Sequence, residues 1–264
     1  MAQRKIRAKD LKKQRWAGIV AAILAFGMLI SLAGVYIGQA VRDRGAVVPE
    51  QQGEPEPEDY LAYYQGEVDR LESYLEEHQA GEAVILELIE NYRYLSFVQQ
   101  VFFDNQEILG EYNARQVSLI NTLIELEPEK PQYRLELINL YLEKGNAQAL
   151  IDAEVAFLIE LLREKPDPLF HLSLIGLLAS TGAEELVREE VEWLYLYLEE
   201  RAAKGLADNE ELLYFAVLIG EYKDDVFAAE EILITVLEQE DEGSIVYQDT
   251  LDYLNYLKSK NNGD

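Results

Sequence analysis

Apolar residues recur at intervals of three or four along almost the whole stretch from residue 60 to residue 257. This spacing places them on one face of successive α-helices, and no segment there alternates apolar and polar residues as a half-buried β-strand does. Short breaks that contain proline, glycine or asparagine separate the apolar stripes and mark helix ends. The pattern predicts an all-α region of about nine helices, from an entry helix over 60–79 to a closing helix over 244–258.

Two placements of the helix boundaries, which we call phases, fit the first long helices. The sequence LELIENY of 86–92 resembles LELINLY of 135–141, which predicts helices over 82–103 and 106–127. Alternatively, Gly110 begins a Gly-Glu-Tyr triplet that recurs at Gly220 and would mark a turn. We favour the first phase because one helical stripe continues through Gly110. The residues of that stripe are Leu109, Tyr112, Leu119, Leu123 and Leu126.

The breaks between helices recur at a fixed interval. Gly145, Gly182 and Gly220 lie 37 and 38 residues apart, and Pro131 lies 37 residues before Pro168. When the sequence is aligned with itself at an offset of 37 residues, apolar positions of one unit coincide with apolar positions of the next. A period near 37 with two helices in each unit is typical of an α-solenoid, in which stacked repeats bury a continuous core.

The unit that begins at Pro131 contains a tyrosine, a Gly-Asn pair, an Ala-x-x-x-Phe pair and a Lys-Pro pair in this order. These residues are Tyr141, Gly145, Asn146, Ala153, Phe157, Lys165 and Pro166. Their order resembles the tetratricopeptide repeat (TPR). The unit is about three residues longer than the family's 34, and Ile138 stands where the family has a small residue. The resemblance implies an α-solenoid of TPR-like helical hairpins over 60–258.

The resemblance also implies a binding surface. In TPR proteins the first helix of each unit lines a concave groove that holds an extended peptide or a partner helix. Asn139 matches the asparagine of the subclass that clamps a C-terminal carboxylate, but Leu135 stands where that clamp needs a basic residue. The implied groove therefore suits apolar or basic segments, although several of its leucines are equally expected in the core between repeats. Its positions are Gln132, Leu135, Glu136, Asn139, Leu142, Leu169, Leu172, Ser173 and Gly176.

Residues 16–38 form an apolar run without a charge. As a helix this run is about 34 Å long, which exceeds the thickness of about 30 Å of a bilayer's hydrocarbon core. Seven basic side chains precede it, so the positive-inside bias predicts a cytoplasmic tail over 1–15 and an extracytoplasmic C-terminal domain. The alternative is a cleaved signal peptide with Gly38 and Ala40 beside the cleavage site, although the apolar run of such peptides is usually about 7–15 residues.

The segments that flank the predicted domain are polar. Residues 39–59 contain three prolines and many acids, which predicts a flexible linker, and 259–264 are expected to form a disordered tail. Within the predicted membrane helix, Gly34 and Gly38 have the GxxxG spacing that lets two such helices approach closely. A homodimer through these glycines is one interpretation, and the general abundance of glycine in membrane helices is the other.

Charge narrows the range of partners. The 264-residue chain carries 50 acidic and 23 basic side chains, a net charge of −27. Residues 1–41 hold seven of the basic groups and one acid, so 42–264 hold 16 basic and 49 acidic groups. A surface this acidic repels a phosphate backbone and lacks the counterion release that drives nucleic-acid binding. Nucleic acid is therefore excluded as a partner.

The amino-acid composition also argues against most classes of catalytic site. The chain has no cysteine and two isolated histidines, and it contains no phosphate-binding glycine loop and no metalloprotease motif. We interpret Glu189 and Glu190 as a solvated helix face and the acidic run 238–243 as a solvated loop. His171 lies in an apolar helix, where a packing role is expected. We predict no cofactor, no metal site and no enzymatic activity.

The anchor, the linker and the repeats together favour a single-pass protein of the cell membrane that binds other proteins. The first hypothesis is an extracytoplasmic scaffold or adaptor of a cell-envelope complex. The second is a membrane-tethered holdase chaperone that binds exported polypeptides as they emerge. The two differ in their partners, because an adaptor binds one dominant protein whereas a holdase binds many unrelated chains.

Overall fold

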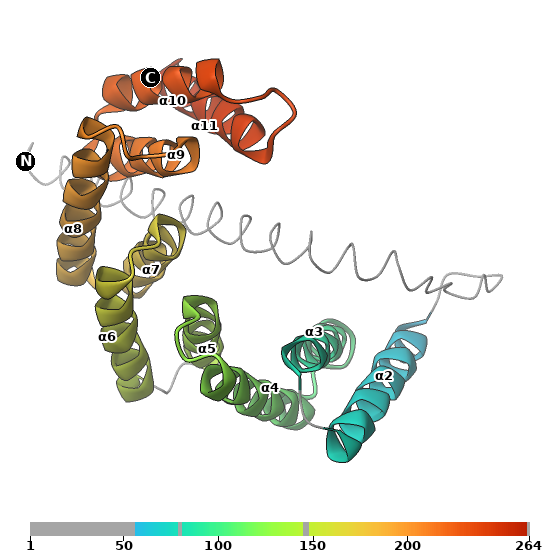
Figure 1. The fold of residues 1–264 in the computed structure, drawn as a ribbon. Coiled ribbons are helices and arrows are strands. Elements are labelled where there is room, and N and C mark those ends of the chain that lie inside the picture. The colour runs from blue at the N-terminus through green and yellow to red at the C-terminus, as the bar shows by residue number, and fades with distance from the viewer. Residues whose placement is uncertain (1–55, 79–80, 145–147, 263–264) are drawn as a thin grey trace, which may run out of the picture. The chain divides into compact units, whose positions relative to one another are not determined.

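The computed structural model describes residues 56–78, 81–144 and 148–262, and over these residues the chain is all-α, without a strand (Figure 1). The predicted all-α class is confirmed. The described residues form two compact units, an N-terminal unit over 56–161 and a C-terminal unit over 162–262, where the sequence predicts one continuous domain. Each unit is described by itself.

The predicted tail 1–15, the membrane segment 16–38 with Gly34 and Gly38, and most of the linker 39–59 lie outside the described residues. Among the helices that the structure does describe, none combines the length and the apolar character that crossing a bilayer requires.

The N-terminal unit consists of helices that follow one another in antiparallel hairpins. They are α2 (Pro57–Glu77), α3 (Glu82–Val98), α4 (Gln106–Leu126), α5 (Pro131–Lys144) and the first part of α6 (Gln148–Glu164). Helix α2 packs on α3, α3 on α4, and α4 on α5. The favoured phase for the long helices is confirmed, because α4 continues through Gly110 without a turn.

Two apolar clusters hold this unit together. The first lies between α2 and α3 and the second between α3, α4 and α5, so α3 contributes to both. Its side chains do this because the apolar positions of α3 occupy an arc wide enough to face two neighbouring helices. The buried members are Val68, Leu71, Leu88, Tyr92 and Leu95 in the first cluster, and Ile85, Ile89, Ile120, Leu123, Tyr133, Leu137 and Leu140 in the second.

The C-terminal unit begins within α6 and contains five further helices. They are α7 (Pro168–Thr181), α8 (Glu184–Ala203), α9 (Asn209–Leu218), α10 (Val226–Gln239) and α11 (Ile245–Asn262). Each helix from α7 to α11 packs on the next, and α9 also contacts α7 and α11. The core of this unit includes Ile175, Val191, Leu194, Leu198, Leu213, Ala216, Leu218, Leu233, Leu254 and Leu257.

Two helices, one in each unit, end in a turn of π-helix. The turn η1 (Gln99–Phe103) follows α3 and the turn η2 (Ile219–Lys223) follows α9. Asp104 and Asp224 then adopt the left-handed conformation, with φ of 48° and 57°, and the next residue caps the following helix through its side chain. The sequence predicts a break at Asp104 but not the π-helical geometry before it.

Two helix ends differ from the predicted ones. Helix α2 begins at Pro57 and not at residue 60, because Glu56 and Asp59 form a capping box and proline fits the first helical position. Helix α11 continues to Asn262, past the predicted end at residue 258 and into the expected disordered tail. No proline or glycine interrupts the chain there before Gly263.

Candidate functional site

The groove positions predicted on α5 differ in their exposure. Leu135 is buried, and it therefore belongs to the interior, as the second interpretation of these leucines expects. Glu136 is half-buried and forms an ion pair with Arg93 of α3. Gln132, Asn139 and Leu142 are half-buried and stay predicted contact positions.

The positions predicted on α7 belong to the C-terminal unit. Ser173 and Gly176 are buried, and the Ser173 hydroxyl donates a hydrogen bond to the Leu169 carbonyl oxygen at 2.9 Å. Leu169 and Leu172 are half-buried, and Leu172 packs against the core of its unit. The two sets of groove positions therefore lie in separate units, each of which has its own surface.

The Ala-x-x-x-Phe pair of the TPR resemblance lies on the exposed side of α6. Ala153 is exposed, and Phe157 keeps 40% of its surface in contact with solvent. The guanidinium of Arg134 covers one side of the Phe157 ring, with its central carbon 3.7 Å from the ring centroid. The buried residues of α6 are instead Ile151, Val155, Leu158 and Leu162.

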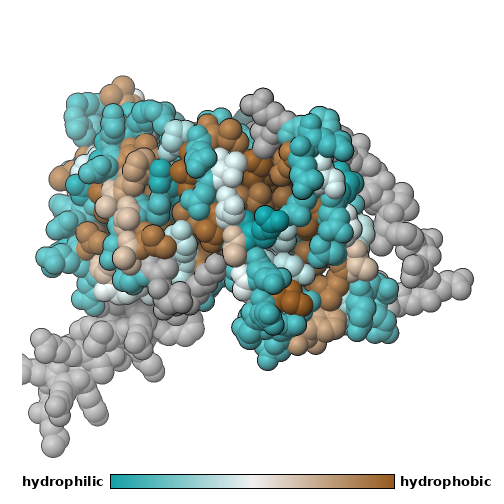
Figure 2. Space-filling view, turned by 90° about the horizontal axis from the view of Figure 1, so that it is seen from below, coloured by the Kyte–Doolittle hydropathy of each residue, from teal (hydrophilic) through white to brown (hydrophobic). Residues whose placement is uncertain are grey.

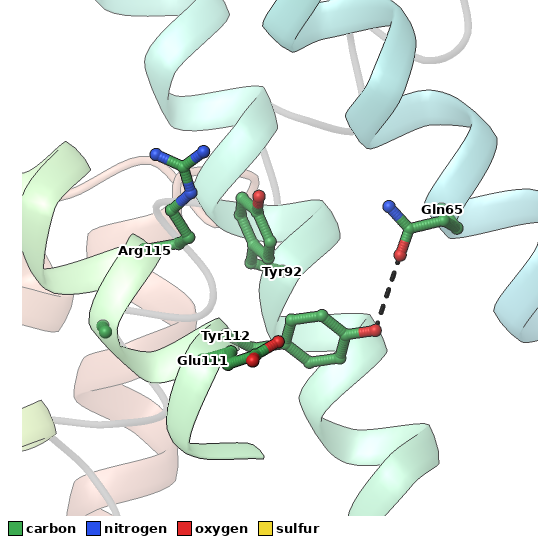
Figure 3. A pocket seen from close by; sticks show the side chains of 6 residues that line it. Gln65, Tyr92, Glu111, Tyr112 and Arg115 are labelled. Atoms are coloured by element: carbon green, nitrogen blue, oxygen red, sulfur yellow. Dashed lines mark hydrogen bonds between the residues drawn. The ribbon is translucent and has the colours of Figure 1, made fainter. Parts of the chain in front are cut away.

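A shallow pocket of about 400 Å³ opens between α2, α3 and α4 of the N-terminal unit (Figure 3). The Tyr112 hydroxyl donates to Oε1 of Gln65 at 3.4 Å, and these two side chains point toward one another across the pocket. The Tyr92 hydroxyl donates to Oε1 of Glu72 at 2.8 Å. The lining residues are Gln65, Tyr92, Glu111, Tyr112, Ala114 and Arg115.

The tyrosines of this pocket are hydrogen-bond donors and not bases. Burial raises the pKa of the Tyr92 hydroxyl above its ordinary value of 10, and its hydrogen bond to Glu72 raises the pKa further. Burial likewise raises the pKa of Tyr112. Both hydroxyls are therefore protonated at neutral pH. The pocket offers aromatic surface and polar contacts to a bound segment.

A buried ion cluster lies between α6, α7 and α8 of the C-terminal unit. The carboxylate of Glu190 accepts a hydrogen bond from Nη2 of Arg163 at 2.6 Å and another from Nε2 of His171 at 2.9 Å. Because a carboxylate can only accept, Nε2 carries the hydrogen of the imidazole. The prediction that Glu190 belongs to a solvated face is wrong, since its side chain is 1% exposed, whereas Glu189 is exposed as predicted.

An aromatic stack continues from this cluster along α8. The His171 ring stacks on Trp193 with centroids 4.8 Å apart, and Trp193 stacks on Tyr197 at 5.6 Å. Arg201 lies over the Tyr197 ring at 5.7 Å and forms an ion pair of 2.8 Å with Glu211. Residues 193, 197 and 201 are spaced by four, which places them on one side of the helix. His171 thus has the packing role that the sequence predicts.

Exposed apolar side chains gather on the side of α3 that faces away from its core, and the last of them, Val101, belongs to the π-helical turn η1 that continues α3. Leu86, Tyr94, Phe97 and Val101 are 42%, 43%, 60% and 55% exposed. We call these four residues the outer α3 face. They recur at the spacing that places them along one side of a helix, opposite the buried positions of α3. Figure 2 shows, for one view of the molecule, that apolar residues reach the surface among hydrophilic ones.

No family model, no curated protein and no solved structure matches this chain. The TPR resemblance therefore stays a prediction from the sequence. Within the residues that the structure describes, no three histidine, aspartate or glutamate side chains come together in a way that suits a metal ion.

Proposed function

We propose that this chain is a membrane-tethered, extracytoplasmic scaffold or adaptor that binds other proteins of the cell envelope and has no enzymatic activity. The apolar segment 16–38 is its anchor and the acidic, proline-rich residues that follow are its tether. The helical hairpins over 60–258 are, in this proposal, an α-solenoid of TPR-like units. The sequence period near 37 supports that arrangement, as does the packing of successive helices from α2 to α5 in one unit and from α7 to α11 in the other.

The outer α3 face is the observation that carries this proposal. A helix that packs on one side normally presents polar residues on the other, yet four of the exposed side chains on this face are apolar or aromatic, with the half-buried Glu90 among them. Contiguous apolar surface of this kind marks an interaction site. Its aromatic members provide the large contact area that anchors protein interfaces.

A holdase is the second candidate, and scattered apolar side chains favour it. Leu206, Phe227 and Ile245 of the C-terminal unit are 59%, 81% and 64% exposed and belong to different helices or connections. Dispersed apolar contacts among many carboxylates suit weak binding to many basic and apolar segments.

Crosslinking in intact cells, followed by affinity capture of the full-length chain and mass spectrometry, tests the proposal. An adaptor yields one dominant envelope protein, and its capture falls when Phe97 and Val101 are both changed to serine. Many unrelated exported chains would identify a holdase instead. Capture of no other protein at all would overturn both candidates.

A further inference from the structure

We infer that the outer α3 face is the docking site for a basic amphipathic helix of a partner protein. This inference rests on the proposed function, to which it adds the surface and the chemistry of the partner. Its evidence is the spacing of the exposed apolar residues, the aromatic residues that extend them onto α2, and the charge around them.

The spacing of the outer α3 face matches that of a helix that binds another helix. Leu86, Tyr94 and Phe97 fall within an arc of about 80° on an ideal α-helix and span about 17 Å along its axis, and Val101 follows in the π-helical turn η1. That length of α3 corresponds to about three helical turns. A partner helix with apolar residues at intervals of three and four covers such a stripe by placing its own ridge of side chains along it.

Tyrosines of α2 extend the apolar surface sideways. The Tyr64 ring stacks on Tyr94 with centroids 4.7 Å apart, and Tyr63 packs edge-on against Tyr64 at 5.2 Å. Tyr63 is 53% exposed and Tyr60, one turn earlier, is 43% exposed. These contacts fix the rings before a partner arrives, so little side-chain freedom is lost on binding.

Charge selects the kind of helix that fits. Glu90 lies within the stripe, between Leu86 and Tyr94, where it is half-buried and forms an ion pair of 3.4 Å with Arg93. Exposed carboxylates also occur at Asp59 of α2, at Asp104 after η1 and at Glu107 of α4. The arginines nearest in sequence are already paired, since Arg93 bonds to Glu136 and Arg70 bonds to Glu67 at 2.7 Å. Carboxylates outnumber arginines in this region, so a partner with lysine or arginine beside its apolar stripe gains ion pairs.

The same charge disfavours the other occupants of an apolar face. Residues 56–262 contain 45 acidic and 14 basic side chains, so an anionic membrane surface repels the domain. A second copy of the chain would bring Glu90 and its acidic neighbours against their own equivalents. Like charges placed together across an interface oppose association.

The test uses the full-length chain in detergent micelles and a labelled amphipathic peptide of about 18 residues, with leucine along one face and lysine on both flanks. We expect the Phe97→Ser, Val101→Ser double variant to bind this peptide at least tenfold more weakly in fluorescence anisotropy, and Glu90→Gln to weaken binding several-fold. The matched control is Phe227→Ser, which removes a more exposed phenylalanine from the C-terminal unit and is expected to leave binding unchanged. A scrambled peptide of the same composition, which has no apolar face, is expected to bind poorly.

Equal loss in the Phe97/Val101 and Phe227 variants, or equal binding of the scrambled peptide, would overturn the inference. A photo-crosslinking residue placed at position 97 in intact cells gives an independent readout. The crosslinked segment is expected to be a helix-forming sequence rich in lysine or arginine. Crosslinks to lipid, to a second copy or to acidic segments would assign the face to another occupant. If crosslinking captures a dominant partner but not through position 97, the surface is wrong and the proposed function stands.

Discussion

Glu189 and Glu190 are neighbours in the sequence and have opposite environments. Glu189 faces solvent, whereas Glu190 is enclosed and accepts hydrogen bonds from Arg163 and His171. Burial raises the pKa of Glu190, but the hydrogen bonds from His171 and Arg163 outweigh burial and hold its pKa below the ordinary value of 4.5. Glu190 is therefore ionised in the folded chain at neutral pH.

Changing Glu190 to glutamine is expected to lower the free energy of unfolding by about 1–3 kcal/mol, because a neutral amide replaces a buried carboxylate that accepts from the buried His171 ring and from the partly exposed Arg163. Glu189→Gln is the matched control and is expected to change stability by less than about 0.5 kcal/mol. Urea titration of the full-length chain, followed by circular dichroism, measures both. Equal stability of the two variants would show that the buried contacts of Glu190 contribute nothing.

The same pair of variants has a pH dependence with a definite sign. A carboxylate whose pKa is lowered in the folded state stabilises the fold above its unfolded pKa, and that stabilisation is lost as the pH falls through the lowered value. The difference in stability between the wild type and Glu190→Gln is therefore expected to be largest at neutral pH and to shrink below about pH 5. A difference that grows on acidification would contradict the assignment.

The role of His171 was predictable from the sequence, whereas that of Glu190 was not. His171 lies among leucines in an almost wholly apolar helix, so its burial follows from the pattern. Glu190 stands four residues before the buried Leu194, on the apolar stripe of α8. That position indicates a buried side chain, whereas the charge of a glutamate indicates an exposed one. Its partners Arg163 and His171 belong to two other helices, and a single sequence does not show which side chains meet across helices.

At the scale of elements, helix positions follow from local signals and π-helical turns do not. Pro131 and Pro168 begin α5 and α7 as predicted, because proline suits the first turn of a helix. A π-turn needs one extra residue in a turn, and the packing of the following helix decides whether that residue is accommodated. The sequence around η2 contains a glycine but no motif that distinguishes a π-turn from an ordinary helix end.

Gly220 in η2 packs closely against α11. A Cβ atom added to Gly220 would lie 2.6 Å from the Tyr253 hydroxyl of α11, and that hydroxyl donates to Oε1 of Glu221 at 3.3 Å. Gly220→Ala is therefore expected to displace the buried Tyr253 ring and to lower the free energy of unfolding by about 1–3 kcal/mol. Thermal unfolding of the full-length chain measures the change.

Gly110 is the matched control for this substitution. It lies inside α4, and an added Cβ atom there meets no other atom within 4 Å. Gly110→Ala is expected to raise stability by about 0.5–1 kcal/mol, because alanine is the better helix former. If both substitutions stabilise the chain, the contact between η2 and Tyr253 is not a tight one.

At the scale of the whole molecule, excess negative charge dominates the electrostatics. The acidic groups of residues 56–262 outnumber the basic groups by 31, and the resulting repulsion opposes the compact state. Raising sodium chloride from about 20 mM to about 500 mM screens this repulsion and is expected to raise the melting temperature by about 2–4 °C. Binding of the basic amphipathic peptide is expected to weaken over the same range.

The opposite response of the melting temperature to salt would show a different balance between attractive ion pairs and the general repulsion. A melting temperature that falls with salt would mean that ion pairs such as Arg134–Glu154, at 2.5 Å, outweigh the general repulsion. The difference in melting temperature between the wild type and Glu190→Gln provides a reference, since the contact between His171 and Glu190 is buried and little screened by salt.

Repeat periodicity predicts the succession of helices but not the division of the chain into two units. The apolar stripe of α6 continues from Val155 and Leu158 to Leu162, on both sides of the boundary, so the pattern contains no break there. For the same reason the sequence groups the positions of α5 and α7 in one groove, although they belong to different units. The sequence pattern does not single out Phe97 as a surface residue, because it lies on α3 opposite the buried stripe and carries no polar neighbour pattern of its own.

Trp193, stacked between His171 and Tyr197, gives the C-terminal unit an optical signal of its own. The chain has two tryptophans, and the other, Trp16, lies in the apolar segment near the N-terminus. With Trp16 changed to phenylalanine, intrinsic tryptophan emission arises from α8 alone and follows the separation of those rings. Comparison of that emission with the loss of helicity would show whether the two units unfold together or one after the other.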